Sequence, residues 1–162
     1  MFQWGKQRDE LRACQQENAA LRAPMTAIRE AMAMIVFTPQ GLVMDANDKF
    51  LHLMEYRLEE VQGVHHRLFC SAELAASRDY QLFWQRLARG ESFTDKFQRQ
   101  TKSGRRVWLE ASYMPVRAAD GSVSQVIKLA ADITAAVDDA QQQHALITAI
   151  NRSMAVIAFN PQ

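Results

Sequence analysis

The chain has 162 residues, of which 48% are hydrophobic, so it has room for one packed domain with flanking helices. Its 19 basic and 18 acidic side chains give a formal charge of +1, which argues against nucleic-acid binding and a polybasic membrane anchor. No apolar run approaches the roughly 20 residues that span a bilayer, and residues 1–8 lack the apolar core of a secretory signal. Cys14 and Cys70 lie far apart in the sequence, so no disulfide is indicated and we expect a cytoplasmic protein.

Residues 1–32 form a predicted helical segment with a seven-residue repeat. Asn18 occupies an a position of this repeat and Leu21 a d position, which favours a coiled-coil homodimer with a fixed register. The alternative is an amphipathic helix that packs on its own domain. Pro24 lacks a backbone donor, so we expect a first helix over 3–23 and a second helical piece over 25–32. The repeat comprises Trp4, Leu11, Asn18 and Met25 in one series and Cys14, Leu21 and Ile28 in the other.

The predicted domain, residues 33–134, begins with a hairpin followed by helices. Residues 34–37 and 42–44 read as short strands, and the Pro39-Gln40-Gly41 sequence between them suits a tight turn. Asn47 or Asp48 is placed to cap a short helix, and another helical turn follows at 58–61. The main helix is expected over 77–89, because its apolar residues recur at helical spacing. These residues are Tyr80, Phe83, Trp84 and Leu87.

Three further strands complete the predicted domain, at residues 92–101, 106–117 and 123–133. In the second of them, Val107, Leu109, Ala111 and Tyr113 share one face, and Trp108 lies on the other. In the third, the shared apolar face is expected to carry Val123, Ile127, Leu129, Ala131 and Ile133. The order predicts an α+β fold, a five-stranded antiparallel sheet with helices over one face, preceded by an N-terminal helix.

An internal repeat joins the two ends of the chain. Residues 26–40 and residues 148–162 are identical at nine of fifteen positions, whereas chance would give roughly one match. The repeat predicts that residues 135–152 form a connecting helix. Residues 153–162 are then expected to be the first strand of a second, truncated copy of the domain.

Several stretches of the chain resemble sequences that recur in PAS domains. They are DAN at 45–47, LEEVQG at 58–63, HHRLF at 65–69, KSGRRVWLEASY at 102–113 and DIT at 132–134. The closest resemblance in style is to soluble methyl-accepting chemotaxis proteins with two PAS domains, of the aerotaxis and biofilm-dispersion type. The resemblance implies a PAS fold over 33–134 and a sensory role.

The resemblance also implies a pocket between the sheet and the helices, which in some relatives holds haem or flavin. His65 or His66 would supply a haem ligand, and no other metal ligand is expected. Trp84 would pack against a flavin ring. A pocket without any cofactor is left equally open, with the histidines satisfied by hydrogen bonds and Trp84 filling the core. The candidate pocket residues are Trp84, His65, His66, Asn47, Tyr80 and Trp108.

No catalytic motif is apparent, so we expect a sensor and not an enzyme. Asp132 and Thr134, in the DIT sequence, are expected to couple the last strand to the next helix. The expected partners are a second copy of the chain, a second PAS domain and output domain in the full-length protein, and chemotaxis signalling proteins. Two alternatives are a cofactor-free dimerisation module and the sensor part of a histidine kinase or cyclic-nucleotide enzyme.

Overall fold

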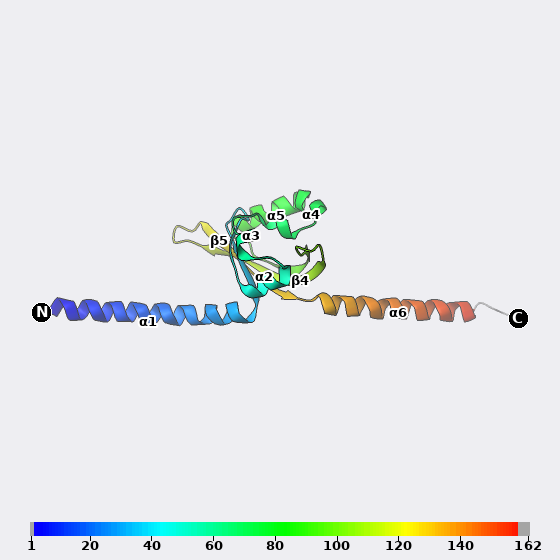
Figure 1. Cartoon of the computed structure of the whole chain (residues 1–162), viewed down its shortest axis with the longest axis horizontal. Helices are drawn as coiled ribbons and strands as arrows, with labels where there is room; N and C mark the ends of the chain where they lie inside the picture. The colour runs from blue at the N-terminus through cyan, green and yellow to red at the C-terminus, as the bar shows by residue number, and fades with distance from the viewer. Residues whose placement is uncertain (1, 159–162) are drawn as a thin grey trace.

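The structure, a computed structural model, describes the backbone of residues 2–158 and the side chains of residues 7–152. A central domain lies between two long helices that leave it in opposite directions, α1 (Phe2–Ala31) and α6 (Thr134–Ala158) (Figure 1). The sheet consists of β1 (Ala33–Phe37), β2 (Val43–Ala46), β3 (Phe93–Gln100), β4 (Arg106–Arg117) and β5 (Val123–Asp132). Between β2 and β3 the chain forms α2 (Asp48–Met54), α3 (Leu58–Val61), a 3-10 turn η1 (His66–Phe69), α4 (Ala72–Ala76) and α5 (Arg78–Ala88).

The sheet has the strand order β2-β1-β5-β4-β3, and every neighbouring pair is antiparallel. The predicted α+β fold is therefore confirmed. The first and last strands of the chain are neighbours at the centre of the sheet, with Ala33 opposite Ala130. Because β1 begins and β5 ends at the same end of this strand pair, the helices α1 and α6 both attach there.

The inner face of β5 differs from the predicted one. Val126, Lys128 and Ala130 are the buried residues of this strand, whereas Ile127 and Leu129 are half-buried on the opposite face. The register explains the difference, because Ala130 lies opposite Ala111, which belongs to the core side of β4. Side chains alternate between faces along a strand, so Lys128 must point into the core together with Val126 and Ala130. Apolar residues occur on both faces of β5, and their pattern alone could not select the inner one.

Helix α1 is one continuous helix and not two pieces divided at Pro24. Proline removes a single backbone hydrogen bond, and residues 7–28 are exposed, so water can satisfy the carbonyl that is left over. The helix does not pack on its own domain over these residues, which excludes that alternative for the heptad. Leu11 and Leu21 are 59% and 70% exposed in the single chain.

Helix α6 continues through residues 153–158, where the repeat predicts the start of a strand. Residues 155–158 correspond to residues 33–36 of the first copy, which belong to a strand because β2 and β5 pair with it on either side. The described chain offers no neighbouring strands to residues 153–158, and their backbone groups can be paired within a helix but not within a lone strand. Residues 159–162, the rest of the predicted strand, lie outside the described residues.

Candidate functional site

His66 is the centre of a polar cluster inside the domain, and its side chain has no exposed surface. Its Nδ1 lies 2.9 Å from the Tyr80 hydroxyl and its Nε2 lies 3.0 Å from the Tyr113 hydroxyl. The backbone N–H of His66 donates to the Gly41 carbonyl at 2.8 Å, which fixes the start of η1 against the β1–β2 turn. Residues from η1, α5 and β4 are thereby joined through one imidazole ring.

Two cations complete this group, which we call the buried cluster: His66, Tyr80, Arg99, Tyr113 and Lys128. Arg99 is 5% exposed, and its Nη2 donates to the Tyr113 hydroxyl at 3.3 Å. Lys128 is 1% exposed, and its Nζ lies 4.9 Å from the centre of the Tyr113 ring. None of the ion pairs among the described side chains involves either cation.

The electrostatics of the buried cluster follow from this lack of a counter-ion. Burial, together with the charges of Arg99 and Lys128, holds the pKa of His66 well below its usual 6.5, so the ring is neutral at pH 7. Burial also lowers the pKa of Lys128. Burial raises the pKa of Tyr113, but the nearby Lys128 and Arg99 outweigh it and the net shift is downward.

Three buried nitrogen atoms among the described side chains have no hydrogen-bond partner: Trp84 Nε1, Arg99 Nε and Lys128 Nζ. A buried donor without a partner costs roughly 1–3 kcal/mol, and more when it is charged. Two of the three belong to the buried cluster, and the third lies on the ring of Trp84, whose centre is 5.4 Å from that of His66. The interior of the domain is therefore rich in unused donors.

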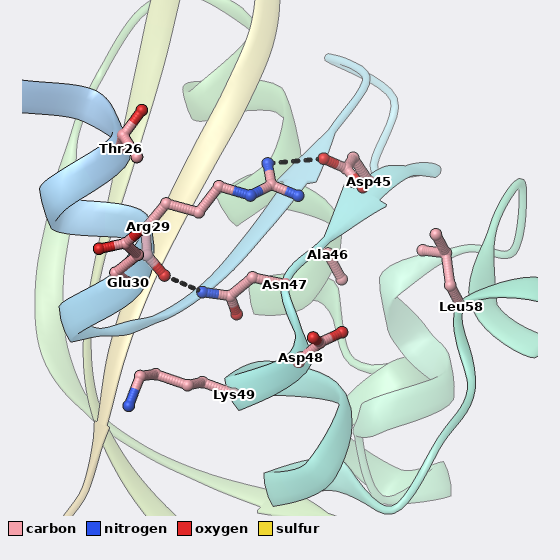
Figure 2. Close-up of a pocket in the computed structure, with 9 residues that line it drawn as sticks. All are labelled: Thr26, Arg29, Glu30, Asp45, Ala46, Asn47, Asp48, Lys49 and Leu58. Carbon is pink, nitrogen blue, oxygen red and sulfur yellow. Dashed lines mark hydrogen bonds and ion pairs between the residues drawn. The ribbon is translucent and has the colours of Figure 1, made fainter. Parts of the chain in front are cut away.

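The N-terminal junction holds the end of α1 to the sheet through Asn47, as Figure 2 shows. The Asn47 amide donates to the carbonyls of Arg29 and Met32 at 2.6 and 2.7 Å. Its Oδ1 accepts from the backbone N–H groups of Met34 and Phe50 at 2.9 and 3.0 Å. A salt bridge of 2.7 Å between Arg29 and Asp45 adds a second contact from α1 to β2. All the hydrogen-bonding capacity of the Asn47 amide N–H groups is used by this junction.

The C-terminal junction is built by four residues around the start of α6. Asp132 Oδ1 accepts from the backbone N–H of Thr134 at 2.9 Å and from its hydroxyl at 2.6 Å. The same hydroxyl oxygen accepts from the Trp108 N–H at 2.9 Å, and the Trp108 carbonyl accepts from the Ile133 N–H at 2.9 Å. Strand β4 is thus tied directly to the first turn of α6.

Comparison with known proteins agrees with this architecture. Residues 30–138 match the family model described as the PAS fold. The chain belongs to the PAS family. It is 43% identical over 136 residues to the biofilm dispersion protein BdlA of Pseudomonas aeruginosa, covering 84% of this chain and 33% of that protein. The chain therefore spans about a third of this relative's length.

Solved structures share the fold of this PAS domain. An RNA-binding light-oxygen-voltage receptor superposes with a TM-score of 0.64 at 25% identity, covering 83% of this chain and 39% of that one. A light-oxygen-voltage domain studied with a flavin analogue superposes with a TM-score of 0.60 at 20% identity, covering 80% of this chain and 96% of that one. The resemblance on which the sequence analysis relied is confirmed at the level of family and fold.

The PAS domain brings four of the six candidate pocket residues together. His65, His66, Tyr80 and Trp84 are neighbours, with the His65 and His66 rings 5.9 and 5.4 Å from that of Trp84. Only His66 is fully buried, as expected for two adjacent histidines. Asn47 is separate from this group, because its side chain binds the end of α1.

Trp108 is the sixth candidate, and it lies on the opposite face of the sheet from the cluster. Its neighbours Val107 and Leu109 point into the core, so alternation turns Trp108 outward beside Thr134 and the first turns of α6. The structure thus assigns the backbone of Trp108 to the C-terminal junction. Its side chain does not reach the interior of the domain.

The arrangement of the interior does not favour either cofactor. Both ring nitrogens of His66 are occupied by tyrosine hydroxyls, so an iron atom would have to displace one of them. The Trp84 ring makes T-shaped contacts with Phe37, Phe83 and His66, so a flavin ring would have to displace some of these side chains to lie against it. Among the described residues no group of three His, Cys, Asp or Glu side chains could hold a metal ion.

Sequence reasoning missed the cationic part of the site. Tyr113 was placed on a strand face but given no role, Arg99 was not singled out, and Lys128 is absent from the apolar face that was predicted for its strand. The signal that would have found Lys128 is its position between Val126 and Ala130, two small apolar residues of the same parity. That signal becomes decisive only with the register of β5 against β4.

Proposed function

We propose that this PAS domain is a cytoplasmic, non-catalytic sensory module of a chemoreceptor that relays a signal through α6 to an output domain. Strand β4 is the observation that supports this role. Its residue Tyr113 belongs to the buried cluster, and its residue Trp108 is bonded to the C-terminal junction. A change in the interior that moves β4 therefore reaches the capping of α6 through one strand. Within the described residues no helix is both long enough and apolar enough to cross a membrane.

The relay needs two packings of β4 with different affinity for the stimulus, since a ligand shifts an equilibrium only through such a difference. Asp132 and Thr134 would convert the position of β4 into the orientation of α6. The similarity to a biofilm dispersion protein supports a place in chemotaxis-type signalling. A sensor of a histidine kinase or cyclic-nucleotide enzyme would use the same junction with a different output.

The variant Asp132→Ala tests this function in the full-length receptor. We expect at least a tenfold loss of the response in biofilm dispersion and soft-agar spreading, because Thr134 loses both bonds to the carboxylate. Asp132→Asn is the matched control, since its amide oxygen can still accept from Thr134 and most of the response should remain. A folded Asp132→Ala receptor with the wild-type response would show that the junction does not transmit.

A dimer through α1 is the second proposal, and the exposed heptad residues support it. Leu11, Leu21 and Ile28 are 59%, 70% and 40% exposed in the single chain, and such a series is stable when it faces an identical helix. A dimer through α1 is also what the alternative function, a cofactor-free dimerisation module, would require.

The variant Leu21→Asp should convert the dimer into a monomer, measured by sedimentation equilibrium. It places a charge at a d position, where two identical helices would bring two carboxylates together. Leu146→Asp on α6 is the control, because Leu146 is 62% exposed but lies outside the α1 heptad. A Leu21→Asp protein with the mass of a dimer would exclude α1 as the interface.

A further inference from the structure

Among the described side chains, the two buried cations of the domain make no ion pair with an acidic residue. Lys128 and Arg99 are 1% and 5% exposed, and each has a nitrogen without a hydrogen bond. An unpaired charge inside a protein costs several kcal/mol. The aromatic rings nearby offset part of this cost, with Lys128 Nζ 5.8 Å from the Phe50 ring and the Arg99 guanidinium 4.9 Å from the Phe97 ring.

We propose that the interior of this PAS domain binds a small carboxylate, held by Lys128 and Arg99. This inference rests on the proposed sensory function and names the chemical class of its stimulus. The carboxylate would supply the negative charge that the described chain does not provide there.

The donors fit a carboxylate better than a bulkier anion. Lys128 Nζ and Arg99 Nε are both unused, and both cations lie against Tyr113, so that a carboxylate could accept a charge-assisted hydrogen bond from each. Phe50, Phe97 and Tyr113 surround the cations and would contact an apolar body attached to the carboxylate. The ligand would therefore be a small organic acid.

A route for such a ligand lies between α4 and the edge strand β3. A groove there reaches Arg99 and is lined by Ser71 and Leu74 on one side. Its described lining also includes Lys96 and Arg106 and contains no acidic side chain, so its potential attracts anions. Helix α4 has no fully buried residue and is the cover that must shift to admit the ligand.

Binding at this place would act on the proposed relay. A carboxylate bound to Lys128 and Arg99 would compete with the Tyr113 hydroxyl for Arg99 and with the Tyr113 ring for Lys128. Tyr113 and Trp108 belong to the same strand, so a shift of Tyr113 changes the support of the C-terminal junction. The ligand would favour the packing of β4 in which its oxygens are fully bonded.

Thermal unfolding of the purified chain with a defined set of acids tests the proposal. The probes are sodium acetate, propionate, pyruvate, succinate and benzoate, each compared with its neutral amide and with sodium chloride at equal ionic strength. We expect at least one acid to raise the melting temperature by roughly 5 °C or more at saturating concentration, and its amide to have no effect. If none of the acids raises the melting temperature above its amide and the salt control, the proposal is overturned.

The variant Lys128→Met provides the specificity test. It keeps the length of the side chain and removes the charge, so the ligand-free protein should melt at the wild-type temperature or above it. The shift caused by the active acid should be lost. Lys49→Met, at an exposed lysine of α2, should retain the full shift. An unchanged shift in the folded Lys128→Met protein would overturn the proposal.

Tyr113 offers an internal alternative to the ligand, because its ionised form would neutralise a cation. A tyrosinate absorbance band near neutral pH in the ligand-free chain, abolished in Tyr113→Phe, would overturn the proposal; its absence supports an external anion. All these measurements use the purified chain and do not depend on an output domain. A failure here is thus distinguishable from a failure of the relay, which is measured with Asp132→Ala in the receptor.

Discussion

Replacing Asn47 with alanine is expected to lower the free energy of unfolding of the PAS domain by about 3 kcal/mol. The variant removes the cap of α2 at Phe50 N and the acceptor for the buried Met34 N–H. It also leaves the carbonyls of Arg29 and Met32 without their donor. A loss of this size is a large fraction of the stability of a small domain, and urea unfolding of the purified chain would measure it.

Two further variants separate the contributions of Asn47. Asn151→Ala makes the same deletion at an exposed position of α6, and a change within about 0.5 kcal/mol is expected there. Asn47→Asp keeps the acceptor for Met34 and Phe50 but presents negative oxygen to the carbonyls of Arg29 and Met32. Asn47→Asp should keep more than half of the stability that Asn47→Ala loses. Backbone hydrogen exchange at the end of α1 should nevertheless be faster than in the wild type. Equal losses for Asn47→Asp and Asn47→Ala would contradict this division of roles.

The stability of the domain is expected to fall steeply as the pH decreases from about 6.5 towards 5, because His66 is buried in its neutral form. In this range an unfolded histidine takes up a proton that the folded His66 does not bind. The stability is therefore complete above the unfolded pKa and is lost as the pH falls towards the depressed folded pKa. The slope should approach about 1.4 kcal/mol per pH unit, measured by urea unfolding at a series of pH values.

The groups that face His66 all favour its neutral form and so maintain this slope. Arg99 and Lys128 oppose a charge on the ring, and the Tyr80 and Tyr113 hydroxyls satisfy its neutral form. His66→Gln keeps a donor and an acceptor and should remove most of the slope, although it lowers the stability at pH 7.

His144→Gln provides the control, because it changes an exposed histidine of α6 and should leave the slope intact. The carboxyl groups of Glu55 and Glu60 add to the slope only near and below pH 5, where unfolded carboxyl groups begin to take up protons. Hydrogen bonds from Ser103 and Lys102 hold their respective pKa values at about 2. A wild-type slope in the His66→Gln protein would show that another group is responsible.

The local elements of the fold could be predicted because they depend on neighbouring residues. Of the four residues in the predicted apolar stripe of α5, Tyr80, Trp84 and Leu87 are buried and Phe83 is half-buried against the core. The cap of α2 and the turn before Gly41 also follow from short-range chemistry. The continuity of α1 through Pro24 was not predictable in this way, because it depends on how water and the rest of the helix compensate for one missing bond.

The candidate site was predictable only in part, for a related reason. His66, Tyr80 and Trp84 were identified from the resemblance and from helical spacing. Arg99 and Lys128 acquire their meaning from the pairing of β3, β4 and β5, which brings together residues far apart in the sequence. The role of Asn47 likewise depends on its hydrogen bonds to the end of α1, which the local sequence around Asn47 does not predict.

The attachment of both long helices to one end of the β1–β5 pair determines how the domain responds to mechanical tension. The helices leave in opposite directions (Figure 1), and the pair Ala33–Ala130 is the nearest rung to both of them. Pulling on the helices would load the two junctions first, at Asn47 and at Trp108–Thr134, and would then open the β1–β5 ladder one rung at a time from Ala33–Ala130. Antiparallel strands that are pulled along their length share the force among all their hydrogen bonds, but this geometry does not allow such sharing. The domain would therefore yield readily to stretching once these junctions have opened.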